Sequence, residues 1–154
     1  MAQTTNSMWG GAGYVGISST GSSWTDISGH SAKVSPTGGD RQQGKAYTFD
    51  GEYPIVKVGK MNERQTRVDI IYTEEAADAW AVARAQFIAA GGGTMYVRWS
   101  PGGGDIGDDL YTTDAGFVVD FQYPEIDAEA TGPIKTYFVV QHATITPSTL
   151  ATAV

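Results

Sequence analysis

The sequence predicts a mainly β protein: an antiparallel β-sandwich or barrel with one flanking α-helix and extended terminal arms. Most apolar residues alternate with polar ones at the two-residue period of a strand, and only residues 74–90 have a clear helical period. A single helix between two groups of strands does not fit a doubly wound parallel sheet, which needs a helix between successive strands. The 154 residues fit one domain of ordinary size.

The expected strands lie on both sides of the helix. Residues 101–109 are rich in Gly and Asp and should form a loop, as should residues 36–43. The last expected strand is apolar on both faces, which is typical of a central strand or of a strand in a subunit interface. The strands are expected within residues 24–35, 46–49, 54–59, 67–73, 94–99, 115–123 and 134–146.

The helix is expected to begin after Thr73, whose hydroxyl can cap its first turn, and to end at three consecutive glycines, residues 91–93. Trp80 and Phe87 lie on its apolar stripe and should pack the helix on the core of the sheet.

The two ends of the chain are rich in small and polar residues. We therefore divide the chain into an N-terminal arm, residues 1–23, a β domain, residues 24–147, and a C-terminal tail, residues 148–154. The arm has too little apolar surface for a core of its own. We expect four of its side chains to dock in a groove between subunits: Trp9, Tyr14, Val15 and Ile17.

No catalytic, cofactor or metal site is predicted. Gly11–Gly16 matches the dinucleotide-binding glycine pattern, but no helix is expected after it. Gly102–Asp108 resembles one copy of a calcium-binding repeat that needs stacked copies. His30 and His142 lie in no triad signature, and there is no cysteine. We therefore expect a protein that is not an enzyme.

The charges are unevenly distributed along the chain, whose formal net charge is -7. Residues 101–133 contain eight acids and no base, whereas seven of the ten bases lie within residues 26–67. Regions of opposite sign suit head-to-tail contacts between copies. The candidates for these contacts are Asp40 and Arg41 in the earlier region and Asp108 and Asp109 in the later one.

The composition also bears on the partners. The negative net charge argues against a surface that grips a nucleic-acid backbone. No window approaches the roughly 20 apolar residues of a membrane-spanning helix. The polar N-terminus lacks the order of a signal peptide, so synthesis in the cytoplasm is expected.

Several short phrases, in their order, resemble the tail tube (major tail) protein of long-tailed, non-contractile bacteriophages over roughly residues 24–148. The phrases are residues 24–29, 44–51, 53–60, 67–73, 95–101 and 144–148.

The resemblance implies six copies per ring and rings stacked head-to-tail into a hollow tube, through which DNA passes without sequence-specific binding. It also implies a place in the virion tail. The expected partners are further copies of the chain and the tail terminator, tape-measure and baseplate proteins.

Two other functions remain open. A carbohydrate-binding β-sandwich could use Trp9, Trp24 or Trp99 as a stacking surface, and a hydrolase with an unrecognised site is a third possibility. Size in solution distinguishes the tube subunit from the sugar-binding module, because a tube subunit should form rings or filaments and a sugar-binding module should stay small.

Overall fold

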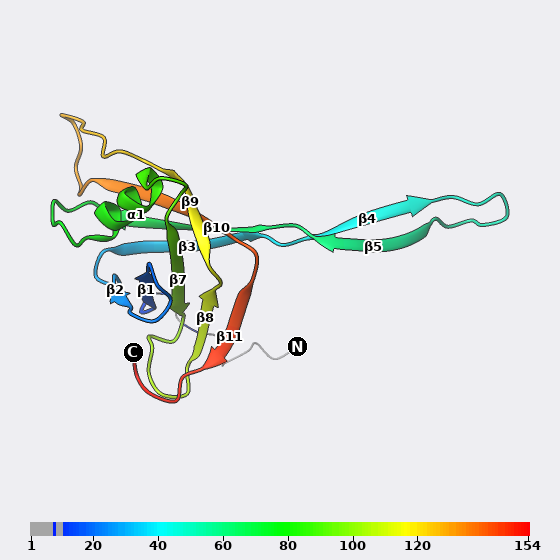
Figure 1. Cartoon of the computed structure of the whole chain (residues 1–154), viewed down its shortest axis with the longest axis horizontal. Helices are drawn as coiled ribbons and strands as arrows, with labels where there is room; N and C mark the ends of the chain where they lie inside the picture. The colour runs from blue at the N-terminus through cyan, green and yellow to red at the C-terminus, as the bar shows by residue number, and fades with distance from the viewer. Residues whose placement is uncertain (1–7, 9–10) are drawn as a thin grey trace.

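The computed structural model describes residue 8 and residues 11–154. In this part of the chain there are eleven strands and one helix, α1 (Ala79–Ile88) (Figure 1). The strands are β1 (Tyr14–Ser18), β2 (Thr25–Asp26), β3 (Ser31–Gly38), β4 (Arg41–Ala46), β5 (Ile55–Met61), β6 (Arg64–Ile71), β7 (Thr94–Ser100), β8 (Asp109–Thr113), β9 (Gly116–Phe121), β10 (Lys135–His142) and β11 (Ile145–Thr149).

Two antiparallel layers form the body of the molecule. One layer has the order β2-β1-β7-β8-β11, and the other has the order β3-β6-β10-β9. Strand β7 joins them, because its first residues pair with β9 and its later residues pair with β1. In Figure 1, β3, β6 and β10 run across the direction of β7, β8 and β11, while β9 lies along the latter. The predicted mainly β, antiparallel fold with one helix is confirmed.

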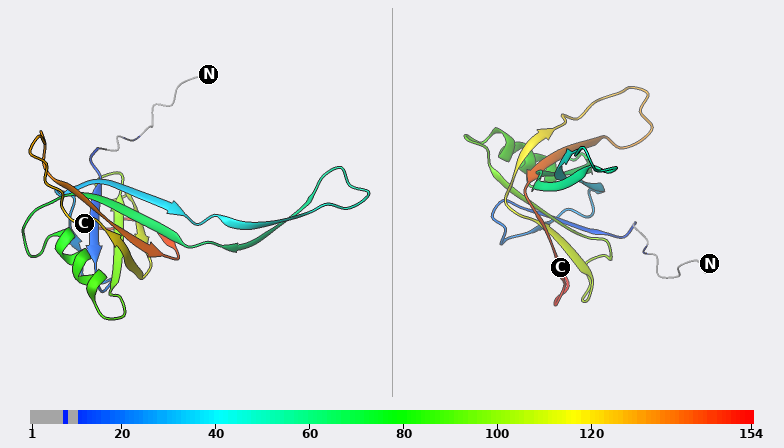
Figure 2. Two further views of the ribbon diagram at one scale, coloured as in Figure 1. Left: turned by 90° about the horizontal axis from the view of Figure 1, so that it is seen from above. Right: turned by 90° about the vertical axis from the view of Figure 1, so that its right-hand side faces the viewer.

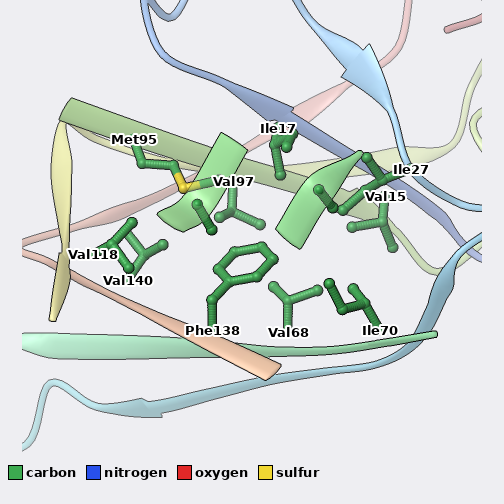
Figure 3. Packing of buried hydrophobic residues seen from close by; sticks show 12 residues of the cluster. Val15, Ile17, Ile27, Val68, Ile70, Met95, Val97, Val118, Phe138 and Val140 are labelled. Atoms are coloured by element: carbon green, nitrogen blue, oxygen red, sulfur yellow. The ribbon is translucent and has the colours of Figure 1, made fainter. Parts of the chain in front are cut away.

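The core lies between these layers (Figure 3). In β6 and β10, alternate residues are fully buried, as the two-residue period of a strand requires. Val15, Ile17 and Val97 face inward from one layer, and Val68 and Phe138 face them from the other.

The helix is shorter than the sequence predicts. It begins at Ala79, not at residue 74, and its N-cap is Asp78, not Thr73. The Asp78 carboxylate accepts a hydrogen bond from the Ala79 amide at 2.6 Å, while the Thr73 hydroxyl donates to the other carboxylate oxygen at 2.8 Å. The cap and the burial of Ala79 and Ala83 in the core therefore decide where the helix begins.

Both ends of the β domain extend beyond the predicted boundaries. Strand β1 pairs with β7 along its whole length, so the expected N-terminal arm includes a strand of the body. Strand β11 pairs with β8, and the Val154 amide donates to the Gly104 carbonyl at 3.1 Å, so the expected C-terminal tail also belongs to the fold. These contacts place residues 14–18 and 148–149 in the sheets, and the division of the chain into arm, domain and tail stays a prediction.

The most unusual feature is a long β-hairpin, residues 41–61, in which β4 and β5 form a two-stranded sheet of their own. It projects far from the body in Figure 1 and in the left view of Figure 2. The loop expected at residues 36–43 is instead the end of β3 and the start of β4, and the strand expected at residues 46–49 is mostly the hairpin tip. The polar sequence of β4 has no alternation, so only its pairing with β5 reveals it as a strand.

Candidate assembly surface

The hairpin presents apolar side chains to solvent along its whole length. Every residue in it is exposed except the partly buried Pro54. An isolated two-stranded hairpin is marginally stable in water, and exposed apolar patches mark interaction sites. This surface is therefore a candidate interaction site. Its large exposed apolar side chains are Tyr47, Phe49, Tyr53, Ile55, Val56, Val58 and Met61.

Charge is separated along the hairpin. Its stem, formed by β4 and β5, carries four bases and no acid: Arg41, Lys45, Lys57 and Lys60. Its tip, residues 47–54, carries two acids and no base, Asp50 and Glu52. The hairpin therefore offers a basic stem and an acidic, aromatic tip to any partner.

The root of the hairpin is tied by backbone hydrogen bonds. The Asn62 amide donates to the Asp40 carbonyl at 2.8 Å, and the Gly39 amide donates to the Glu63 carbonyl at 3.2 Å. Gly38 has a φ of 80°, and a side chain there would collide with the Glu63 carbonyl oxygen. The hairpin thus continues the β3–β6 pair.

The four predicted contact residues lie in two separate places. Asp40 and Arg41 lie at the hairpin root, whereas Asp108 and Asp109 lie where the β7–β8 loop meets β8, at the bottom of Figure 1. The Asp108 carboxylate accepts hydrogen bonds from the Gly104 amide at 3.2 Å and the Asp105 amide at 3.0 Å. Asp108 therefore organises its own loop, while the exposed Asp109 remains available for a contact with another copy.

The predicted docking residues of the arm are already in use within the chain. Tyr14, Val15 and Ile17 belong to β1 and are buried by the chain's own sheets, because their backbone completes the layer beside β7. The expectation that they dock on a neighbour is corrected for these three residues. Trp9 lies outside the described residues.

The helix is attached to the sheet by a cluster of aromatic rings. The Trp80 ring meets those of Tyr72, Phe121 and Tyr123 at centroid distances of 5.3, 6.1 and 5.9 Å, and its Nε1–H donates to the Gln122 carbonyl at 2.8 Å. Phe87 contacts Phe121 at 4.9 Å but remains 42% exposed. Trp80 thus packs between the helix and the sheet, whereas Phe87 is only partly covered.

His142 is buried on β10, and both of its ring nitrogens have hydrogen-bond partners. Its Nε2 lies 2.8 Å from the Thr66 hydroxyl, and its Nδ1 lies 3.1 Å from the Thr144 carbonyl oxygen. A neutral ring protonated at Nδ1 satisfies both partners, since it donates to the carbonyl and accepts from the hydroxyl. Burial lowers the pKa of His142, although the Thr144 carbonyl and the nearby Asp114 oppose this shift.

An apolar slot opens between the layers near the hairpin root. It has a volume of about 450 Å³. The rings of Trp99 and Tyr111 stack along it with centroids 5.9 Å apart. Of its residues, only Trp99 is a candidate from the sequence, because the slot residues come from five different strands. They are Pro36, Arg64, Trp99, Tyr111, Ile145 and Pro147.

The glycine pattern and the acidic residues that resemble nucleotide-binding or metal-binding motifs do not form such sites in the described residues. The last three residues of Gly11–Gly16 belong to β1, and no helix follows them directly. Within the described residues, no group of three or more His, Asp or Glu side chains could hold a metal ion, and no helix is long and apolar enough to cross a membrane.

Trp24 packs against Tyr96 and beneath Arg98, so its ring is not an open sugar platform.

Comparison with known proteins gives a match in fold but not in sequence. No family model and no curated protein matches the chain. A chain from the anti-feeding prophage baseplate aligns with a TM-score of 0.68 at 10% identity, covering 97% of this chain and 98% of that one. A chain of the PVC sheath-tube complex, from an extracellular contractile injection system, aligns at 0.66 and 9%, covering 95% and 94%.

A third similar structure is a chain from the tail of an empty GTA (gene transfer agent) particle, with a TM-score of 0.56, 11% identity and coverage of 97% and 100%. At such low identities the alignments show a shared fold. The chain therefore has, over nearly its whole length, a fold found in components of contractile injection systems and gene transfer agent tails.

Proposed function

We propose that this protein is a structural subunit that self-assembles into the tube of a phage-type tail or injection particle. The observation that carries the proposal is the projecting hairpin, whose exposed apolar side chains need a second copy of the chain to cover them. The match in fold to tail and injection-particle components along nearly the whole chain supports the same function.

In the finer form of the proposal, six copies form a ring, and rings stack head-to-tail into a hollow tube through which DNA passes. The tube belongs to the virion tail, its subunits are made in the host cytoplasm, and it meets terminator, tape-measure and baseplate proteins. The sequence resembles proteins of non-contractile tails, whereas the similar structures include a contractile injection system. The proposal therefore covers a tube with or without a surrounding sheath.

Electron microscopy of the purified protein in negative stain, over a range of concentrations, tests this function. We expect hollow tubes or stacked rings whose end views have sixfold symmetry. A protein that stays monomeric at the highest concentration would contradict the proposal. Binding of that monomer to a glycan array would favour the carbohydrate-binding alternative.

A further inference from the structure

The size and the lining of the slot suit the binding of an aromatic segment. Its volume of about 450 Å³ falls within the roughly 300–1,000 Å³ of pockets that hold small ligands, so it has room for aromatic side chains. Trp99 and Tyr111 are partly exposed along it, and Ile145 adds an aliphatic wall. Within the described residues, no acidic side chain forms an ion pair with Arg64, which also lines the slot. The slot thus offers apolar walls and one cation.

The hairpin tip has the complementary chemistry. Tyr47 and Tyr53 are 76% and 81% exposed, and Phe49 is fully exposed. Asp50 and Glu52 supply negative charge, and residues 47–54 contain no base. The basic stem lacks this complementarity, because its charge has the same sign as Arg64. The tip is therefore the part of the hairpin that fits the slot in both polarity and charge.

A copy cannot place its own tip in its own slot. The slot lies at the body, where Pro36 and Arg64 belong to the strands that lead to and from the hairpin. The stem holds the tip at the far end, well away from the body in Figure 1 and in the left view of Figure 2. An occupant of the slot with the chemistry of the tip must come from another copy.

We propose that the hairpin tip of one copy, residues 47–54, binds in the slot of a second copy, with its aromatic rings against Trp99 and Tyr111 and its acids near Arg64. The proposal rests on self-assembly and specifies its contact. Two different surfaces meet, so each copy offers one tip and one slot and the contact can be repeated from copy to copy.

Cysteine trapping tests the contact directly, because the natural chain has no cysteine. Phe49→Cys and Pro147→Cys are made as two separate single-cysteine proteins, mixed, allowed to assemble and treated with a short bismaleimide. We expect a covalent dimer that contains one copy of each variant. The matched control replaces Pro147→Cys by Ile126→Cys, which is 91% exposed in the β9–β10 connection and should give little dimer.

The outcomes separate this contact from the proposed function. Tubes that form without a Phe49–Pro147 cross-link, or with an equally strong cross-link to Ile126, would overturn the tip-in-slot contact and leave the tube function standing. A chain that forms neither tubes nor cross-links would overturn both.

Charge reversal gives a second measurement that does not depend on cysteine. Arg64→Glu should reduce the rate of assembly roughly tenfold, because it places an acid beside Asp50 and Glu52. Adding Asp50→Arg and Glu52→Arg to the same chain should restore most of the rate. Loss without rescue, in a protein whose melting temperature is unchanged, would contradict a contact between these charges.

Discussion

Trp80 holds the helix on the β body through ring contacts and one hydrogen bond to the Gln122 carbonyl. Trp80→Ala should lower the free energy of unfolding by about 3 kcal/mol, the lower end of the range for emptying a buried aromatic site, because the residue is only partly buried. Chemical denaturation measures the loss. Phe87→Ala is the matched control on the same helix and, at 42% exposure, should cost less than about 1.5 kcal/mol. Equal losses would show that the helix is not attached mainly through Trp80.

His142 makes stability depend on pH at the residue scale. Burial holds the pKa of His142 below the ordinary value of 6.5. Between the native and the unfolded pKa, the unfolded chain therefore binds a proton that the native chain does not bind. Stability should therefore fall as the pH drops below about 6.5 and should level off once the pH passes the lowered native pKa. His142→Gln should remove this component, which urea titrations at pH 7.5, 6.5 and 5.5 would reveal.

The partly exposed His30 supplies the control for that experiment. His30→Gln should keep the pH profile of the natural chain, because the profile is assigned to the buried ring of His142. A His142→Gln profile that is parallel to the natural one would assign the pH dependence to other groups.

At the scale of elements, β1 tests whether the start of the chain folds by itself or on assembly. It pairs with β7 at five positions, and Val15 and Ile17 belong to the core. The amides of residues 14–18 that bond to β7 should therefore exchange slowly in the free subunit as well as in the tube. Hydrogen exchange followed by mass spectrometry measures both states. Fast exchange in the free subunit would mean that β1 is ordered only by a neighbour.

The hairpin is the element on which assembly should depend. Replacing residues 42–60 by Asn-Gly, a favoured two-residue turn, should leave the melting temperature nearly unchanged, because the hairpin contributes no residue to the core. The same variant should form no tubes in electron micrographs, because it lacks the exposed apolar surface. Tubes of normal length from this protein would show that other surfaces suffice.

At the scale of the whole molecule, the uneven charge should make assembly sensitive to salt. The Debye length falls to about 3 Å at 1 M salt, so attraction between basic and acidic regions of neighbouring copies should weaken. Asp109→Lys should slow assembly at low salt, whereas Asp109→Asn should slow it less, as light scattering can measure. Asp108 is unsuitable for this test, because its carboxylate holds the β7–β8 loop. Growth that is independent of salt would indicate that apolar contacts dominate.

The parts of this protein that depend on local periodicity could be predicted without the structure. The two-residue spacing of Val68 and Ile70, with Asp69 between them, predicts the inward face of β6, whereas the last strand is apolar on both faces in the sequence and only the packing shows which face of β10 is inward. The change of period near Trp80 predicts the single helix. These patterns suffice because each repeats within one segment of chain.

The features that join distant segments become visible only in the folded chain. Strand β4 has no periodic signal and exists because β5 pairs with it. Strand β1 belongs to the body because β7 lies beside it, although its composition suggested a mobile arm. The slot unites residues as far apart as Pro36 and Pro147. Strand pairing and packing depend on partners far away in the chain, so a local sequence pattern cannot predict them.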